Sequence, residues 1–257
     1  MAGDEPLVKE ETVDALDIRV YANRQAMGTA AAREVAATMR DLLATQGRVR
    51  MIFAAAPSQN GFLAALSDAP ALDWSRVTAF HMDEYLGLPM EAPQHFGTFL
   101  RAHLFDRVHP GIVHLIDSAN ETAAECARYG ALLHEAPIDI VCLGIGENGH
   151  IAFNDPPVAD FDDPEAIKPV ELDLMCKQQQ VNDGCFATIG DVPSHALTLT
   201  IPMLLSGAYL SCVVPGPAKR QAIHDTLRGP ITTACPASIL RRHPACVLYL
   251  DRDSAGA

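Results

Sequence analysis

Short apolar runs alternate with alanine- and leucine-rich amphipathic segments along this chain. Five of the runs are typical of buried strands, and each is followed by a glycine, a proline or a polar cluster. Strands that alternate with helices predict a mainly parallel sheet with helices on both faces, a Rossmann-like α/β domain. The predicted strands are 49–56, 77–80, 138–144, 209–214 and 245–250, and the predicted helices are 24–45, 62–67, 96–105, 121–135 and 218–227.

Other segments fit this alternation less well. The first twenty residues are mixed and acidic, so we expect an extended lead-in (1–20) to a single α/β domain (21–257). Segment 156–191 is rich in Asp, Pro and Gln, which predicts a long loop, and such a loop inside a compact domain is often a lid. Beyond it, apolar alternation at 196–201 predicts one more strand.

Composition and charge narrow the class of protein. The chain has 257 residues, 49% of them hydrophobic, and no apolar run long enough to span a bilayer. The acidic first residues lack the layout of a signal peptide, so a cytoplasmic protein is expected. Seven cysteines without a C-x-x-C pair favour reduced thiols, and no metal site is predicted. A net charge of −13 argues against nucleic acid and anionic membranes as partners.

Polar clusters follow four of the predicted strands. They are 57–61, 81–89, 144–155 and 215–219. In open α/β sheets, ligands bind beyond the carboxyl ends of the strands. The four loops are therefore expected to converge on one site.

One of these loops matches a dinucleotide-binding motif. The stretch Gly144-Ile145-Gly146-Glu147-Asn148-Gly149 fits G-x-G-x-x-G, a motif that should open a helix in a first βαβ unit. Here it lies past the middle of the chain and leads to two consecutive prolines, which do not continue a helix. Nicotinamide or flavin binding is therefore not favoured.

Three side chains in these loops are candidates for proton transfer. Asp83 is a candidate base, since a carboxylate is ionised at neutral pH and can move a proton between adjacent carbons of a sugar. His150 can act on a ring oxygen, with Asp155 orienting it. The alternatives are a solvated turn for Asp83 and a structural, hydrogen-bonded ring for His150.

Two loops offer groups that suit an anion. Lys219 lies at the start of a predicted helix, where a lysine and free backbone N–H groups together favour an anion. The segment Ser58-Gln59-Asn60 also precedes a helix and can cradle a phosphate, or simply cap the helix. An ordinary exposed lysine is the alternative for Lys219.

The motifs resemble those of the glucosamine-6-phosphate deaminase/isomerase family, relatives of the 6-phosphogluconolactonases. The resemblance covers the chain from about residue 24 to its last predicted strand. It rests on Met82-Asp83-Glu84-Tyr85-Leu86-Gly87-Leu88-Pro89 and on the stretch from Gly144 to Gly149 continued by His150-Ile151-Ala152-Phe153-Asn154-Asp155-Pro156. The G-H-I-A-F-N-acid-P pattern is that of the deaminase branch.

The resemblance implies conversion of an amino-sugar phosphate to fructose 6-phosphate and ammonia, with no metal or organic cofactor. It implies that Asp83 moves the proton between C2 and C1, that His150 assists ring opening, and that Asp155 and Asn148 tune the histidine. Lys219 matches the family's phosphate lysine. The candidate substrate-binding residues are Ser58, Gln59, Asn60, Gly146, Lys177 and Lys219.

The chain departs from the family where the phosphate binds. A phosphate-binding arginine of the family is expected near Gly184, yet the preceding segment offers glutamines and Lys177. A close analogue of glucosamine 6-phosphate is therefore left open as the substrate. A lactone hydrolase and a non-catalytic sugar-phosphate-binding protein are the alternative functions, and a homo-oligomer is left open.

Overall fold

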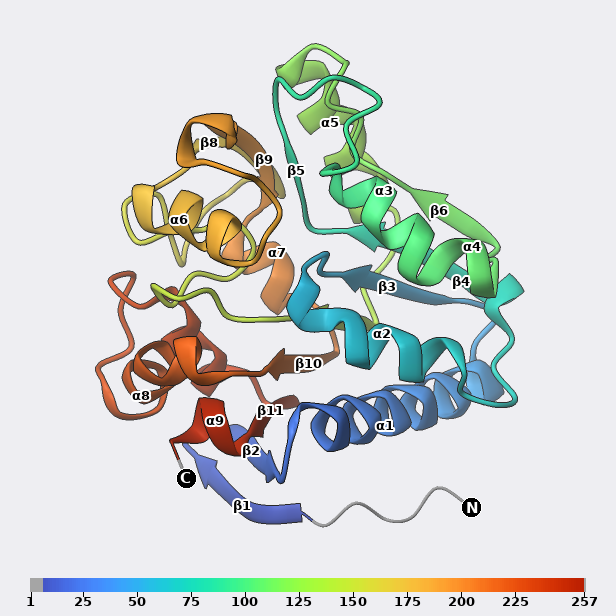
Figure 1. Ribbon diagram of the computed structural model, residues 1–257. Coiled ribbons are helices and arrows are strands. Elements are labelled where there is room, and N and C mark those ends of the chain that lie inside the picture. Colours follow the sequence, from blue (N-terminus) through green and yellow to red (C-terminus); the bar gives the residue numbers. More distant parts are fainter. Residues whose placement is uncertain (1–6, 257) are drawn as a thin grey trace.

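The computed structural model describes residues 7–256, and an eight-stranded sheet forms its centre (Figure 1). Its strands are β1 (Leu7–Val13), β2 (Leu16–Tyr21), β3 (Val49–Phe53), β4 (Val77–His81), β6 (Ile112–His114), β7 (Ile140–Leu143), β10 (Tyr209–Val214) and β11 (Cys246–Asp251). In space they lie in the order β1-β2-β11-β10-β7-β3-β4-β6, and all neighbours are parallel except β1 and β2. The predicted mainly parallel α/β fold is confirmed.

Helices cover both faces of this sheet (Figure 1). They are α1 (Arg24–Thr45), α2 (Asn60–Ser67), α3 (Phe96–Leu100), α4 (Asp106–Val108), α5 (Thr122–His134), α7 (Ile201–Leu205), α8 (Arg220–Arg228) and α9 (Arg252–Ala255). Because side chains alternate along a strand, Met51 and Phe53 of β3 pack in a core with α1, α2 and α3, whereas Ile52 packs in a second core with α5, α7 and α8. All five predicted helices and all five strands of the main alternation overlap observed elements.

A second, smaller sheet stands beside the carboxyl ends of the large one (Figure 1). It is antiparallel and consists of β5 (Asp83–Tyr85), β9 (His195–Leu199) and β8 (Ile167–Glu171), in that order. Strand β9 confirms the strand predicted at 196–201. The long loop predicted at 156–191 is wrong for much of its length, since it contains β8 and α6 (Leu174–Asn182). Both elements are short and polar, so their periodicity is weak.

The lead-in predicted at residues 1–20 is also wrong where the structure describes it. Residues 7–21 form the β1–β2 hairpin, and β2 pairs in parallel with β11 inside the large sheet. Alternating Leu16, Ile18 and Val20 are buried, a period of two that the charged residues around them obscure. Residues 1–6 of the predicted lead-in lie outside the described residues.

The order of the strands positions the loops. The chain passes from β2 through α1 to β3, builds outward to β4 and β6, and returns through α5 to β7 between β3 and β10. Strand β7 is therefore a topological switch point, where the loops after neighbouring strands diverge and leave a crevice. Within residues 7–256, none of the helices combines the length and the apolar character that crossing a bilayer would require.

The hairpin can be tested with one substitution at two positions. Leu16→Ala should lower the free energy of unfolding by about 2–5 kcal/mol, because this side chain is 0% exposed. Leu7→Ala, at a leucine that is 42% exposed, should change it by less than about 0.5 kcal/mol. Urea unfolding of both variants measures the difference, and equal effects would contradict the packing of β2.

Candidate active site

A cleft at the switch point gathers side chains from four loops and from α6. The loops after β3, β4, β7 and β10 line it, as the sequence predicted. The lining includes six of the predicted residues: Ser58, Gln59, Asp83, Gly146, His150 and Lys219. Candidate base, candidate acid and candidate anion-binding lysine therefore lie in one crevice.

Four predicted residues lie outside the lining of this cleft. Asn148 and Asp155 lie behind His150, which they contact. Asn60 begins α2 and is exposed. Lys177 is half-buried on α6, but the residues of α6 that line the cleft are Gln179 and Gln180. The prediction that Asn60 and Lys177 hold the anion is not supported by these positions.

Asp83 is held in the small sheet and is only 7% exposed. Strand β5, which it begins, pairs with β9 so that Asp83 lies opposite Thr198. Burial, and then the neighbouring charge of Glu84, raises the pKa of Asp83 well above its ordinary value. A carboxylate with a raised pKa is a stronger base than a solvated one, which suits abstraction of a proton from carbon.

The next residue, Glu84, anchors this strand from the other side. Its carboxylate accepts the backbone N–H groups of Phe96 (3.1 Å) and Gly97 (3.0 Å) at the start of α3. His95 Nδ1 lies 3.2 Å from Glu84 Oε1. Burial alone raises the pKa of Glu84, but the bonds from His95 and the backbone outweigh it, so the net direction is down. Glu84 is therefore a fixed structural anion beside Asp83.

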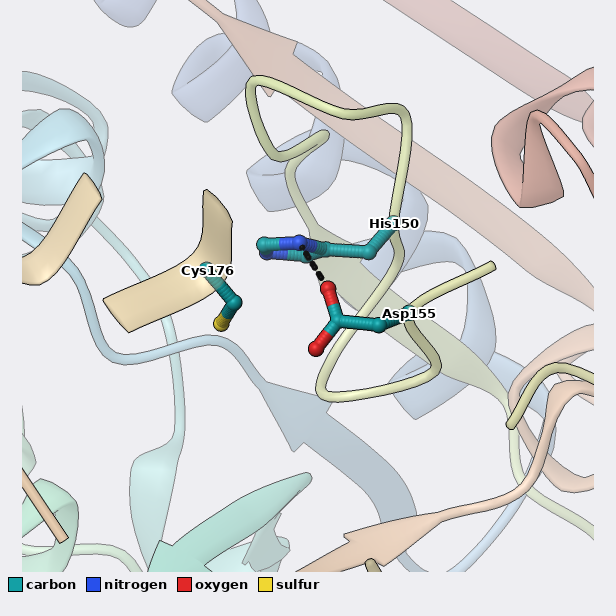
Figure 2. Close-up of side chains that lie close together, drawn as sticks. All are labelled: His150, Asp155 and Cys176. Atoms are coloured by element: carbon teal, nitrogen blue, oxygen red, sulfur yellow. Dashed lines mark ion pairs between the residues drawn. The ribbon is translucent and has the colours of Figure 1, made fainter. Parts of the chain in front are cut away.

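His150 packs on a glycine and faces a carboxylate. A Cβ at Gly146 would come within 2.2 Å of the His150 ring, so only glycine leaves room for the imidazole there. On its other side His150 Nδ1 lies 2.8 Å from Asp155 Oδ1 (Figure 2). Nδ1 is not aligned for a hydrogen bond with that oxygen, so the two groups are in close polar contact, which is an ion pair only when the imidazole is protonated.

Asn148 joins the two partners. Its amide Nδ2 donates to Asp155 Oδ1 (2.9 Å), and its Oδ1 accepts the backbone N–H of His150 (3.1 Å). Burial raises the pKa of Asp155, but the contacts with His150 and Asn148 prevail and hold that pKa below its ordinary value. Asp155 is therefore an ionised group that orients the His150 ring.

A thiol completes this cluster. Cys176 of α6 lies beside Asp155 and His150, and the three residues offer ligand atoms within 4.8 Å of one another (Figure 2). Burial, and then the charge of Asp155, raises the pKa of the Cys176 thiol well above its ordinary value. The group is therefore a neutral thiol and not a nucleophile. The sequence did not single out Cys176, since it has no C-x-x-C partner.

Lys219 is a buried ammonium without a counter-ion. Its side chain is 6% exposed and makes no hydrogen bond or ion pair with any residue in 7–256. Burial lowers the pKa of Lys219, and the charges of Asp183 and Glu147 oppose that shift from farther away. A buried cation without a partner is unfavourable, so the position favours an anionic ligand.

The side chains of Ser58 and Gln59 differ in whether they are free to bind a ligand. Gln59 Nε2 donates to the backbone oxygen of Val213 on β10 (3.1 Å), so this amide fixes the loop rather than being free for a ligand. Ser58 keeps its hydroxyl donor, since its Oγ only accepts from Gln59 at 3.4 Å. Of the predicted Ser58-Gln59-Asn60 cradle, Ser58 is thus the side chain placed to bind.

Two cleft residues on α6 were missed by sequence reasoning. Gln179 and Gln180 both line the cleft, whereas the family arginine was expected near Gly184, which lines an adjoining cavity instead. Gln179 is fixed, because it accepts the backbone N–H of Glu147 (2.8 Å). The run of glutamines in the sequence was the available signal, but the helical phase of α6 was needed to select these two.

The chain belongs to the family described as glucosamine-6-phosphate isomerases and 6-phosphogluconolactonases, whose model matches residues 22–248. It is thus a member of an enzyme family of the isomerase/deaminase type. It is 35% identical over 184 residues to a glucosamine-6-phosphate deaminase of Bacillus cytotoxicus, covering 71% of this chain and 68% of that protein. It is 37% identical over 185 residues to the glucosamine-6-phosphate deaminase of Exiguobacterium sibiricum, covering 72% of this chain and 71% of that protein.

Solved structures agree with this assignment. A structure described as a monomeric glucosamine-6-phosphate deaminase superposes with a TM-score of 0.85 at 26% identity, covering 93% of this chain and 98% of the other. A 6-phosphogluconolactonase from Thermotoga maritima gives a TM-score of 0.75 at 18% identity, over 94% and 100% of the chains. The second likeness shows the shared fold alone.

The buried charge of Asp83 has a thermodynamic consequence. A raised pKa stabilises the folded state only at low pH, where Asp83 is protonated, and that contribution is lost as the pH rises through the raised value. Asp83→Asn should therefore raise the Tm at pH 8, where a carboxylate is ionised in the unfolded chain. Near pH 4 the gain should vanish. Thermal unfolding at both pH values tests this, with the exposed Asp41→Asn as control; equal behaviour of the two variants would refute it.

Proposed function

We propose that this protein is an aldose–ketose isomerase and deaminase that converts glucosamine 6-phosphate, or a close analogue, to a ketose ester and ammonia. The observation that carries the proposal is the cleft itself, in which a buried carboxylate, a carboxylate-paired histidine and an unpaired lysine face one space. The named relatives support it.

Ring opening is assigned to His150. The imidazole takes the proton of the sugar's C1 hydroxyl and returns a proton to the ring oxygen, which yields the open-chain aldehyde. The Asp155 carboxylate lies 2.8 Å from Nδ1 and faces the ring throughout this step. Gly146 keeps the ring at the cleft wall.

The isomerisation is assigned to Asp83. The carboxylate takes the proton from C2, which gives an enolamine, and then delivers it to C1. The resulting imine at C2 adds water and releases ammonia, leaving the ketone of a fructose ester. Only proton transfers and water are needed, and the raised pKa of Asp83 supports both the removal and the return of the proton.

The cleft must widen for this reaction. Its volume of about 70 Å³ is below the several hundred Å³ typical of ligand pockets. A cavity of about 310 Å³ adjoins it and shares Ala55, Phe96 and Gln180. A movement of α6 would join the two spaces. We therefore propose that α6, which lies within segment 156–191, acts as a lid. A cytoplasmic location and a homo-oligomer stay predictions.

Two assays separate the proposal from its alternatives. Ammonia release from glucosamine 6-phosphate is expected, and hydrolysis of 6-phosphogluconolactone is not. The lactone hydrolase has weaker support, since a lactonase needs a histidine and water but gives Asp83 no task. Hydrolysis of the lactone without ammonia release would establish that alternative, and inactivity toward both would favour a binding protein.

Loss of the base should abolish deamination. Asp83→Asn keeps the shape of the side chain but cannot accept a proton, so kcat for ammonia release should fall by about 10²–10⁴-fold. Binding of a non-reactive sugar-alcohol ester should change little. Asp41→Asn is the matched control, because Asp41 is exposed and lies on α1, outside the lining of the cleft. A variant at residue 83 that keeps normal turnover would refute the assigned role.

The neutral residue behind His150 should set the pH profile. Asn148→Asp places a second carboxylate where Nδ2 now donates to Asp155 at 2.9 Å. The added negative charge favours protonation of the His150–Asp155 pair, so the limb of the pH–kcat profile that reports this pair should move up by about one unit. Profiles of both proteins measure the shift. An unmoved limb would show that Asn148 does not act through the pair.

A further inference from the structure

The part of the cleft lined by Ser58, Gln180 and Lys219, here called its anion-binding end, contains two buried polar side chains without partners. Gln180 is 7% exposed and its carboxamide makes no hydrogen bond with any residue in 7–256. Lys219, 6% exposed and also unpaired, lines the same space. Neither the amide nor the ammonium is among the fully enclosed unpaired atoms of the described residues, so both polar groups still open onto the cleft. Both are thus placed to be satisfied by a ligand rather than by the fold.

The fixed charges at this end are few. Among the described residues that line the cleft, Lys219 is the one lysine or arginine. Arg24 lies near the rim, but its guanidinium donates to the Pro57 carbonyl and does not line the cleft. The charges of Asp183 and Glu147 act on Lys219 and offset part of its field. The helix start at α2 adds about half a unit of positive charge at most.

The remaining donors are neutral. Gln180 offers an amide N–H₂ and Ser58 a hydroxyl, which bind an oxyanion without balancing its charge. A phosphate monoester is largely dianionic above its second pKa of about 6, and burying it here would leave one negative charge unbalanced. A singly charged ester of the same tetrahedral shape would be balanced by Lys219 alone.

We propose that Gln180 and Lys219 select a hexose carrying a singly charged ester, such as a sulfate, over a dianionic phosphate. Gln180 is the specificity-determining residue, because it supplies a hydrogen bond where an arginine would supply a second charge. The inference rests on the proposed function for the identity of the sugar. It adds the charge of the ester group that the sugar carries.

Binding of non-reactive ligands tests the charge preference. Glucitol 6-sulfate and glucitol 6-phosphate have neither an aldehyde nor an amine, so they cannot react. Calorimetry at pH 8, where the phosphate is dianionic, should give a Kd for the sulfate equal to or lower than that for the phosphate. A wild-type protein that binds the phosphate ten-fold or more tightly than the sulfate would overturn the inference.

A charge swap tests the residue. Gln180→Arg should shift the ratio of the two Kd values toward phosphate by about ten- to a hundred-fold, because a guanidinium adds charge and two parallel donors. Gln178→Arg is the matched control, since it adds the same charge on the exposed side of α6. Unfolding curves of both variants confirm that they fold. An unchanged ratio in folded Gln180→Arg, or an equal shift in Gln178→Arg, would refute the role of Gln180.

The outcome is separable from that of the proposed function. If the wild type releases ammonia from glucosamine 6-phosphate and also prefers phosphate in binding, the function stands and the charge inference fails. If glucosamine 6-phosphate and glucosamine 6-sulfate both release no ammonia, the function fails, whereas the binding ratio still decides the preference. A higher kcat/KM for the 6-sulfate supports both.

Discussion

The geometry of the candidate active site depends on one buried carboxylate, that of Glu84. Glu84 accepts the backbone N–H groups of Phe96 and Gly97 and contacts His95, and these bonds fix the strand on which it lies. Since adjacent residues of a strand point to opposite sides, fixing Glu84 on the α3 side turns Asp83 toward the cleft. Burial raises the pKa of Asp83 and the charge of Glu84 raises it further, so one anion both positions the candidate base and strengthens it.

The small sheet connects this base to the histidine loop. Strand β9 pairs with β5, and its Thr198 accepts the backbone N–H of Phe153 (3.0 Å) from the loop that carries His150. In the same loop, Asn154 donates to the backbone oxygen of Leu199 (2.8 Å). Two loops of the candidate site that are far apart in sequence are therefore both held by one strand, β9. Their relative position is set by the backbone pairing of β5 with β9 and by side-chain-to-backbone hydrogen bonds between β9 and the His150 loop.

Sequence reasoning reached the parts of the fold where a local pattern carries the information. The large sheet follows from apolar runs, and the convergence of Asp83, His150 and Lys219 follows from the geometry of parallel strands. Strands β1, β2 and β8 were mispredicted, because each has exposed or half-buried charged residues between its other positions and is held in place by pairing with another strand. Helix α6 was mispredicted because it is short and mostly polar. Gln180 could not be selected from its neighbours without knowing which face of α6 meets the cleft.

The two halves of the cleft are built differently. Around His150 the side chains of Asn148 and Asp155 are joined by a hydrogen bond and a close polar contact, so a change at one residue alters its neighbours. In the part of the cleft around Lys219, the residues Lys219, Gln180 and Ser58 come from three separate segments, and within residues 7–256 no side-chain hydrogen bond joins them directly to one another. Groups without shared partners respond to substitution nearly additively. Under our proposals, this part of the cleft can therefore change the charge it accepts while the candidate proton-transfer residues stay intact. The chain would then keep the residues of the family motifs and differ in the ester that it binds.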